Sequence, residues 1–174
     1  SGEFWSGTWK PCMNELDFFE VRHGLGYSVL TSRFQKIKTE KTIFVDPSDP
    51  VEIWRVGLTN EGSKPRRLSV FSYLEWCLGN AADTHREVHK TFIETQIDRT
   101  HHVIYGLKRP ALVPGHISTG LSESPLEAFH AAHPKPVAYE GDKEAFFGRY
   151  GGNRVLARGH ARTSDAVAAR SRAR

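Results

Sequence analysis

Hydrophobic and polar residues alternate along several short segments of the chain. One such segment covers residues 52–58. Trp54, Val56 and Leu58 fall on one side of an extended strand there, whereas Arg55 falls on the other. This period of two predicts a β-strand. Because Trp54 alternates with aliphatic residues, we expect its side chain in the core.

A second alternating segment covers residues 68–76 and includes Trp76, which we also expect in the core. Residues 60–65 separate the two segments and read Asn-Glu-Gly-Ser-Lys-Pro, residue types that favour a turn. A turn between two strands of this length predicts a β-hairpin.

Other short strands are expected at residues 27–31, 39–45, 92–97 and 102–107. No convincing helical period precedes residue 120. Prolines interrupt residues 110–138, which predicts a loop there with one helical turn near residues 125–130. Many short strands without a long helix predict an all-β fold, an antiparallel β-sandwich.

The length of 174 residues suits one domain with a sizeable core. The formal net charge of +4 is accounted for by residues 155–174, which hold five arginines and one aspartate. Residues 1–154 are therefore neutral overall, and no nucleic-acid partner is expected. We expect a sandwich domain over residues 1–154 and an irregular Arg/Ala-rich tail over residues 155–174, disordered or non-native.

Cysteine use indicates the compartment. The chain has only Cys12 and Cys77, far from the density of a disulfide scaffold, which favours a reduced cytoplasmic setting. No apolar run reaches the length of a membrane span, so no membrane partner is expected. The chain opens on Ser-Gly-Glu-Phe without an initiator methionine, and we expect it to be a fragment of a longer protein.

The stretch 18–28 is unusually dense in glycines, aromatic residues and charges, which suggests a shaped site. Gly24 and Gly26 leave the backbone free to take a positive φ or to approach another group closely. The adjacent Arg22 and His23 are candidates for positioning a substrate or for an interface.

An alternative stays open for Arg22, which stands two residues from Glu20 and can form a structural ion pair with it. Trp5 and Trp9 are candidates for stacking on sugar rings, and their burial in the core is the other possibility. A hydrolase would need two carboxylates, and Glu20 with Glu75 is the pair that the sequence offers.

The segment 83–90 follows a predicted strand and concentrates His85, Arg86, His89 and Lys90. The two histidines are four residues apart, as metal ligands on a helix can be. The zinc-protease signature, however, needs Glu where Arg86 stands, and a third ligand is not evident. We therefore expect no metal here, and a solvated charged loop stays open as the plain alternative.

Four motifs resemble those of one enzyme family when they are taken in order. They are the stretches 4–11, 22–28, 50–56 and 69–78. Together they resemble the amino-terminal β-sandwich, of the supersandwich type, of inverting glycoside phosphorylases of the cellobiose and cellodextrin phosphorylase type, glycoside hydrolase family 94. The resemblance is firm to residue 98 and looser to residue 150, and the last twenty residues show none.

The resemblance implies an incomplete sandwich that is a non-catalytic part of a longer phosphorylase. That enzyme takes an oligosaccharide with a β-glucosidic bond and cleaves it with inorganic phosphate. The products are an α-sugar 1-phosphate and a shortened sugar. In the family the catalytic aspartate lies in a downstream (α/α) barrel, and no Asp or Glu of this chain matches it. The resemblance thus implies inorganic phosphate as co-substrate, no cofactor, and a homodimer.

In the family, the loop after the strand at residues 69–78 reaches the neighbouring subunit's active site and contacts the acceptor sugar. The matching positions hold His89 and Lys90, with His85 and Arg86 nearby. Cellobiose-specific members carry a Gln-Arg pair there, so the acceptor sugar stays open. A stand-alone carbohydrate-binding or interaction sandwich is the alternative from another class.

Overall fold

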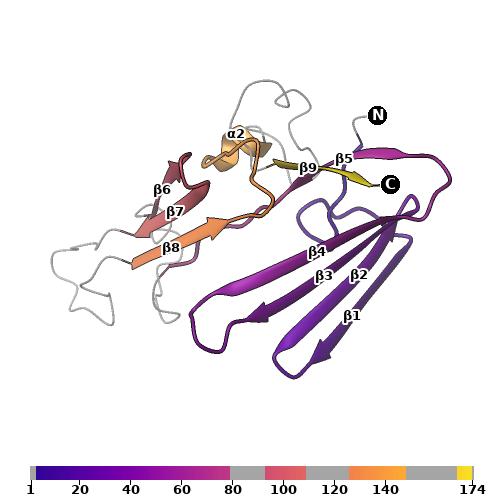
Figure 1. The fold of residues 1–174 in the computed structure, drawn as a ribbon, viewed down its shortest axis with the longest axis horizontal. Coiled ribbons are helices and arrows are strands. Elements are labelled where there is room, and N and C mark those ends of the chain that lie inside the picture. The colour runs from indigo at the N-terminus through magenta and orange to yellow at the C-terminus, as the bar shows by residue number, and fades with distance from the viewer. Residues whose placement is uncertain (1–2, 79–92, 109–125, 148–167, 174) are drawn as a thin grey trace. The chain divides into compact units, whose positions relative to one another are not determined.

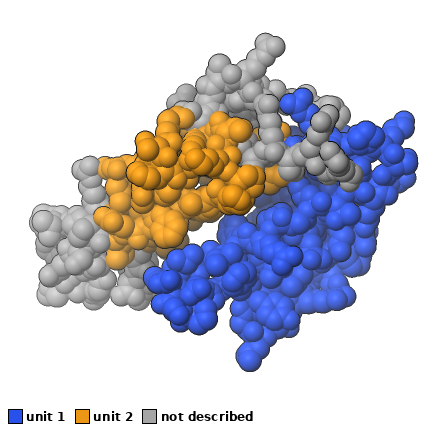
Figure 2. Space-filling model, in the orientation of Figure 1, with its two compact units in different colours: residues 1–68, 144–161, 171–174 blue, residues 69–143, 162–170 orange. Residues whose placement is uncertain are grey.

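The computed structural model describes residues 3–78, 93–108 and 126–147 with their side chains, and the backbone of residues 168–173. These residues form antiparallel sheets and one short helix, α2 (Lys143–Phe147), as the all-β prediction requires (Figure 1). The chain divides into two compact units, which Figure 2 distinguishes by colour. Unit 1 comprises residues 1–68, 144–161 and 171–174, and unit 2 comprises residues 69–143 and 162–170.

Unit 1 contains a four-stranded antiparallel sheet in the order β1-β2-β3-β4 (Figure 1). Its strands are β1 (Phe18–Gly24), β2 (Tyr27–Phe34), β3 (Ile37–Val45) and β4 (Glu52–Asn60). Each strand pairs with the next one along the chain. The strands expected within residues 27–31, 39–45 and 52–58 are confirmed.

Two tight turns fix the register of this sheet. Leu25 and Gly26 join β1 to β2, and Gly26 has a φ of 81°. A Cβ on Gly24 would lie 2.3 Å from Cζ of Tyr27. Both uses expected of the glycines are therefore present: Gly26 takes the positive φ, and Gly24 allows the close approach of Tyr27. Both glycines shape the β1–β2 hairpin. Gln35 and Lys36 join β2 to β3 with φ values of 48° and 65°, the pattern of a type I′ turn.

Side chains that are paired across strands share one face of a sheet, so the register separates two faces. One carries most of the aliphatic residues and is called the apolar face. It holds Phe19, Val21, Leu30, Phe34, Ile37, Ile43, Val45, Trp54, Val56 and Leu58. The period of two correctly placed Trp54 on this face, but the expectation that it lies in the core is wrong, because 36% of the residue is exposed.

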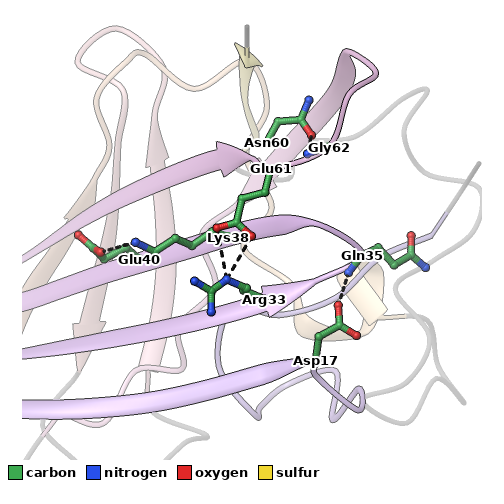
Figure 3. Close-up of polar contacts among 8 residues, drawn as sticks. All are labelled: Asp17, Arg33, Gln35, Lys38, Glu40, Asn60, Glu61 and Gly62. Atoms are coloured by element: carbon green, nitrogen blue, oxygen red, sulfur yellow. Dashed lines mark hydrogen bonds and ion pairs between the residues drawn. The ribbon is translucent and has the colours of Figure 1, made fainter.

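The opposite, polar face carries ion pairs, two of which Figure 3 shows. The Arg33 guanidinium lies 3.1 Å from the Glu61 carboxylate, and the Lys38 ammonium lies 3.2 Å from Glu40. All four side chains are substantially exposed to solvent. Exposed pairs of this kind contribute little to stability, so this face reads as the solvated side of the sheet.

The amino-terminal segment covers one end of the apolar face. Trp5 stacks on Phe34 with ring centroids 5.2 Å apart. Ile37, opposite Phe34 in the register, and Ser32 are each only 1% exposed, and Cys12 is also buried. The core of this unit therefore sits where the chain enters the sheet.

Unit 2 contains a three-stranded antiparallel sheet in the order β6-β7-β8. Its strands are β6 (Ile93–Asp98), β7 (Val103–Lys108) and β8 (Leu126–Ala131). A cluster of Ile104 and Tyr139, packed by Trp76 and Ile97, forms its core. The strands expected within residues 92–97 and 102–107 are confirmed, and so is the core position of Trp76.

Two expectations about strands are wrong. The strand β5 (Arg66–Phe71) ends five residues before Trp76, and it pairs with β9 (Ala168–Ala173), whereas β4 pairs with β3. The turn at residues 60–65 is present, since the Asn60 carboxamide accepts a hydrogen bond from the amide of Gly62, but it joins strands that do not pair. A helical turn was expected near residues 125–130, but the described part of that range, from Leu126 onward, belongs to the strand β8 (Leu126–Ala131).

The strand β9 lies in the tail, and residues 155–167 lie outside the described residues. The boundary at residue 154 stays a prediction. Cys12 and Cys77 are both free thiols. Among the helices of the described residues, none has the length and apolar character needed to cross a membrane.

Candidate functional site

The expected acceptor loop lies outside the described residues. This holds for all four of its candidates, His85, Arg86, His89 and Lys90. Their role at an acceptor sugar stays a prediction.

Arg22 and His23 are adjacent on β1 and so point to opposite faces of the sheet. The Arg22 guanidinium lies 3.0 Å from the Glu20 carboxylate on the polar face, and its side chain is 75% exposed. On the other face, Nδ1 of His23 lies 2.8 Å from Oγ of Ser28. The ion pair left open for Arg22 is present, and the two residues do not form one joint site.

Trp5 and Trp9 have different environments. Trp5 packs its ring on Phe34 and is partly buried. Trp9 is 55% exposed, and its carbonyl accepts a hydrogen bond from the amide of Met13 in a turn. Of the two, only Trp9 presents the exposed ring that stacking on a sugar requires.

A polar cluster interrupts the exposed part of the apolar face. The ammonium of Lys41 lies 3.4 Å from the ring centroid of Trp54, and the indole N–H of Trp54 donates a hydrogen bond to Glu52. Burial lowers the pKa of Lys41, and the nearby Glu52 carboxylate partly offsets this. The lysine thus covers one side of the indole ring. Sequence reasoning missed this cluster because it depends on the register between β3 and β4.

Unit 2 holds a second polar pair that sequence reasoning missed. Oγ of Ser72 lies 2.8 Å from Nε2 of His130 on β8. Burial lowers the pKa of His130, which favours the neutral form of its imidazole. Ser72 belongs to the motif at residues 69–78, but its partner stands 58 residues further along the chain.

The carboxylates proposed for a hydrolase are both engaged within their own units. Glu20 pairs with Arg22, and Glu75 pairs with Lys143 at 2.8 Å. Glu75 also accepts a hydrogen bond from the Tyr73 hydroxyl at 2.7 Å, and burial together with this contact raises the pKa of Tyr73. These contacts favour structural roles. In the part of the chain that the structure describes, no three His, Cys, Asp or Glu side chains gather as a metal site would require.

The sequence also matches the model of a known protein family. The family model described as "Glycosyl hydrolase 94, supersandwich domain" matches residues 1–162. This match includes the first eight residues of the tail, where no resemblance was expected.

Curated relatives agree with the family match. Over 155 residues the chain is 34% identical to solabiose phosphorylase of Paenibacillus borealis, a match that covers 87% of the chain and 18% of the relative. It is 30% identical over 158 residues to N,N'-diacetylchitobiose phosphorylase of Vibrio proteolyticus, covering 86% of the chain and 18% of the relative. The Vibrio furnissii enzyme of the same name is 37% identical over 84 residues, 47% of the chain and 10% of the relative. The chain thus spans less than a fifth of the length of these relatives.

Proposed function

The chain belongs to the glycosyl hydrolase 94 supersandwich domain family, and from that premise we propose that it is the non-catalytic amino-terminal domain of a glycoside phosphorylase. The resemblance found in the sequence motifs is thereby confirmed. The complete enzyme would act on β-glucosides of the cellobiose or cellodextrin kind and release an α-sugar 1-phosphate. Inorganic phosphate would be its co-substrate, with no cofactor.

The exposed part of the apolar face is the observation that carries this proposal. Val45 is 58% exposed, Val56 47%, Val21 38% and Trp54 36%, and all four lie on that one face. Exposed apolar side chains that gather on one sheet face favour an interaction surface, and here the Lys41–Trp54–Glu52 cluster adds polar groups among them. A domain that packs against the remainder of a larger enzyme would carry such a surface.

The chemistry of phosphorolysis agrees with a supporting role for this domain. Inverting cleavage needs one acid to protonate the leaving oxygen and a nucleophile on the opposite face of the sugar. Because phosphate is the nucleophile, one protein carboxylic acid suffices, and the family places that aspartate in its downstream (α/α) barrel. The ion pairs of Glu20 and Glu75 leave each of them a structural role here.

In the complete enzyme, we propose a cytoplasmic homodimer in which the loop with His89 and Lys90 contacts the acceptor sugar of the partner subunit. These two residues depart from the Gln-Arg pair of the cellobiose-specific members, so the proposal leaves the identity of the acceptor sugar open. His85 and Arg86 would flank this contact.

A stand-alone carbohydrate-binding sandwich is the second candidate, and the exposed ring of Trp9 is the observation in its favour. Trp5 does not extend this surface into a platform, because its ring packs on Phe34. Isothermal titration of the chain with cellobiose and cellodextrins separates the two candidates. The phosphorylase proposal predicts no binding by the chain alone. Binding that is lost in Trp9→Ala and kept in Lys64→Ala, an exposed turn residue, would favour the second candidate.

A further inference from the structure

The strand β1 lies at one edge of its sheet, and the other edge of β1 pairs with no strand of the described residues. It is seven residues long, contains no proline, and runs in unbroken register with β2. Exposed edges of this kind are commonly blunted by proline, bulges, very short length or charged side chains, because they pair readily with another strand. The edge of β1 has no proline, no bulge and no short length, and its charged residues Glu20 and Arg22 have opposite signs.

The hairpin turns determine which backbone groups of β1 point outward. In an antiparallel ladder, hydrogen-bonded and non-hydrogen-bonded pairs alternate, and a two-residue turn is closed by a hydrogen-bonded pair. Phe34 closes the β2–β3 turn with Ile37, so the even-numbered residues of β2 bond to β3 and the odd-numbered ones to β1. The odd-numbered residues of β2 pair with even-numbered residues of β1. Phe19, Val21 and His23 therefore direct their N–H and C=O groups to the free edge.

We infer that this edge pairs with the same edge of a second copy of the chain, antiparallel and centred on Val21. In this register Val21 faces Val21 of the second copy, and Phe19 faces His23 on the apolar face. All three outward-facing residues thus meet outward-facing residues. Such an interface is isologous, with the same patch on both copies, and it joins the two sheets into one.

Charge complementarity selects this register. On the polar face, Glu20 comes opposite Arg22 of the second copy, and Arg22 comes opposite Glu20. Within each copy these side chains already pair at 3.0 Å, so the interface sets four charges in alternating order. Opposite charges directly across two strands stabilise the pairing, and like charges destabilise it.

Aromatic residues complete the polar side of the interface. Phe18, 38% exposed, comes opposite Gly24 of the second copy. The Tyr27 ring lies over Gly24, where a Cβ would come within 2.3 Å of it, and Tyr27 is 50% exposed. Phe18 of one copy and Tyr27 of the other therefore meet at each end of the paired strands and gain burial.

This inference rests on the proposed function in one respect, because it names the surface at which the proposed homodimer forms. Its tests are independent of catalysis. Failure of β1 pairing removes this interface and leaves the phosphorylase proposal standing, whereas loss of phosphorolysis leaves the interface standing.

A disulfide cross-link tests the register. In a Cys77→Ser background, Val21→Cys should form a covalent dimer under mild oxidation, because a hydrogen-bonded antiparallel pair sets Cα atoms about 5.5 Å apart, within disulfide range. Glu20→Cys is the matched control, because residue 20 faces residue 22 in this register. Cross-linking at neither position, or at both equally, would overturn the inferred register.

Sedimentation velocity tests the interface without cysteines. Val21→Pro removes an outward N–H and keeps the bonds to β2, so it should give a monomer that still shows a cooperative thermal transition. Glu20→Lys should weaken dimerisation about tenfold or more, and the charge-swapped Glu20→Lys/Arg22→Glu should restore it. A parent chain that stays monomeric at its highest soluble concentration, or a dimer that none of these variants alters, would contradict the inference.

Discussion

His130 on β8 and Ser72 share a hydrogen bond, with 2.8 Å between Nε2 and Oγ. The contact ties the edge strand of the β6-β7-β8 sheet to the extended segment that follows β5. Because burial lowers the pKa of His130 below its ordinary value of 6.5, the folded chain holds this imidazole in its neutral form.

The stability of the chain should therefore depend on pH through His130. A group whose pKa is lowered on folding takes up its proton at a higher pH in the unfolded chain than in the folded one. Its contribution to the free energy of unfolding is therefore complete above the unfolded pKa and is lost as the pH falls below it. We expect the urea midpoint to fall between about pH 7.5 and about pH 5.5. His130→Gln, which cannot titrate, should flatten this slope. An equally steep slope in the variant would assign the pH dependence to other groups.

The packing of Trp76 gives a second prediction. A Cβ on Gly106 would lie 2.6 Å from Cδ2 of Trp76, whose ring packs on the core cluster of unit 2. Gly106→Ala should therefore lower the free energy of unfolding by about 1–3 kcal/mol. Gly57→Ala is the matched control in another strand, because its nearest atom would be 3.9 Å away. Equal effects of the two variants in urea denaturation would show that the close approach is not a constraint.

The two amino-terminal tryptophans should differ in their effect on stability. Trp5→Ala removes the ring that packs on Phe34 and should cost about 2 kcal/mol, less than for a fully buried tryptophan. Trp9→Ala should change the free energy of unfolding by no more than about 0.5 kcal/mol, because Trp9 is largely exposed. Chemical denaturation followed by circular dichroism measures both. A larger loss for Trp9→Ala would contradict the assignment of Trp5 to the core.

The proposed acceptor loop is tested in the complete enzyme by reverse-reaction kinetics. Loss of a polar contact with the acceptor in His89→Ala or Lys90→Ala should raise the KM for the acceptor sugar about tenfold. The KM for the sugar 1-phosphate donor should not change. Lys64→Ala, in the exposed turn after β4, serves as the control. Unchanged acceptor KM values in both loop variants would remove these residues from the acceptor site.

The sequence predicted strands well where one side of the strand is apolar. The alternation of Trp54, Val56 and Leu58 identified β4 and the face on which these residues lie. The alternation did not predict how far these side chains are buried, because the described residues cover only one end of that face. Strand alternation indicates which side chains share a face, whereas burial depends on what packs against that face.

The strand β8 shows why one element was missed. Leu126, Ala128 and His130 are its more buried residues, while Phe129 is 54% exposed. A histidine on the buried side and a phenylalanine on the exposed side remove the hydrophobic period of two. The neighbouring prolines then favoured a loop. The Ser72–His130 contact could not be predicted for the same reason, since it requires the placement of β8.

The central claim is that this domain supports a phosphorylase and does not itself catalyse. It is tested most directly by measuring the release of sugar 1-phosphate from cellobiose, longer cellodextrins and N,N'-diacetylchitobiose, with and without inorganic phosphate. The chain alone is compared with the chain joined to its native downstream sequence. We predict phosphate-dependent release only by the longer protein. Release by the chain alone, or no release by either protein while the chain still binds sugar, would contradict the claim.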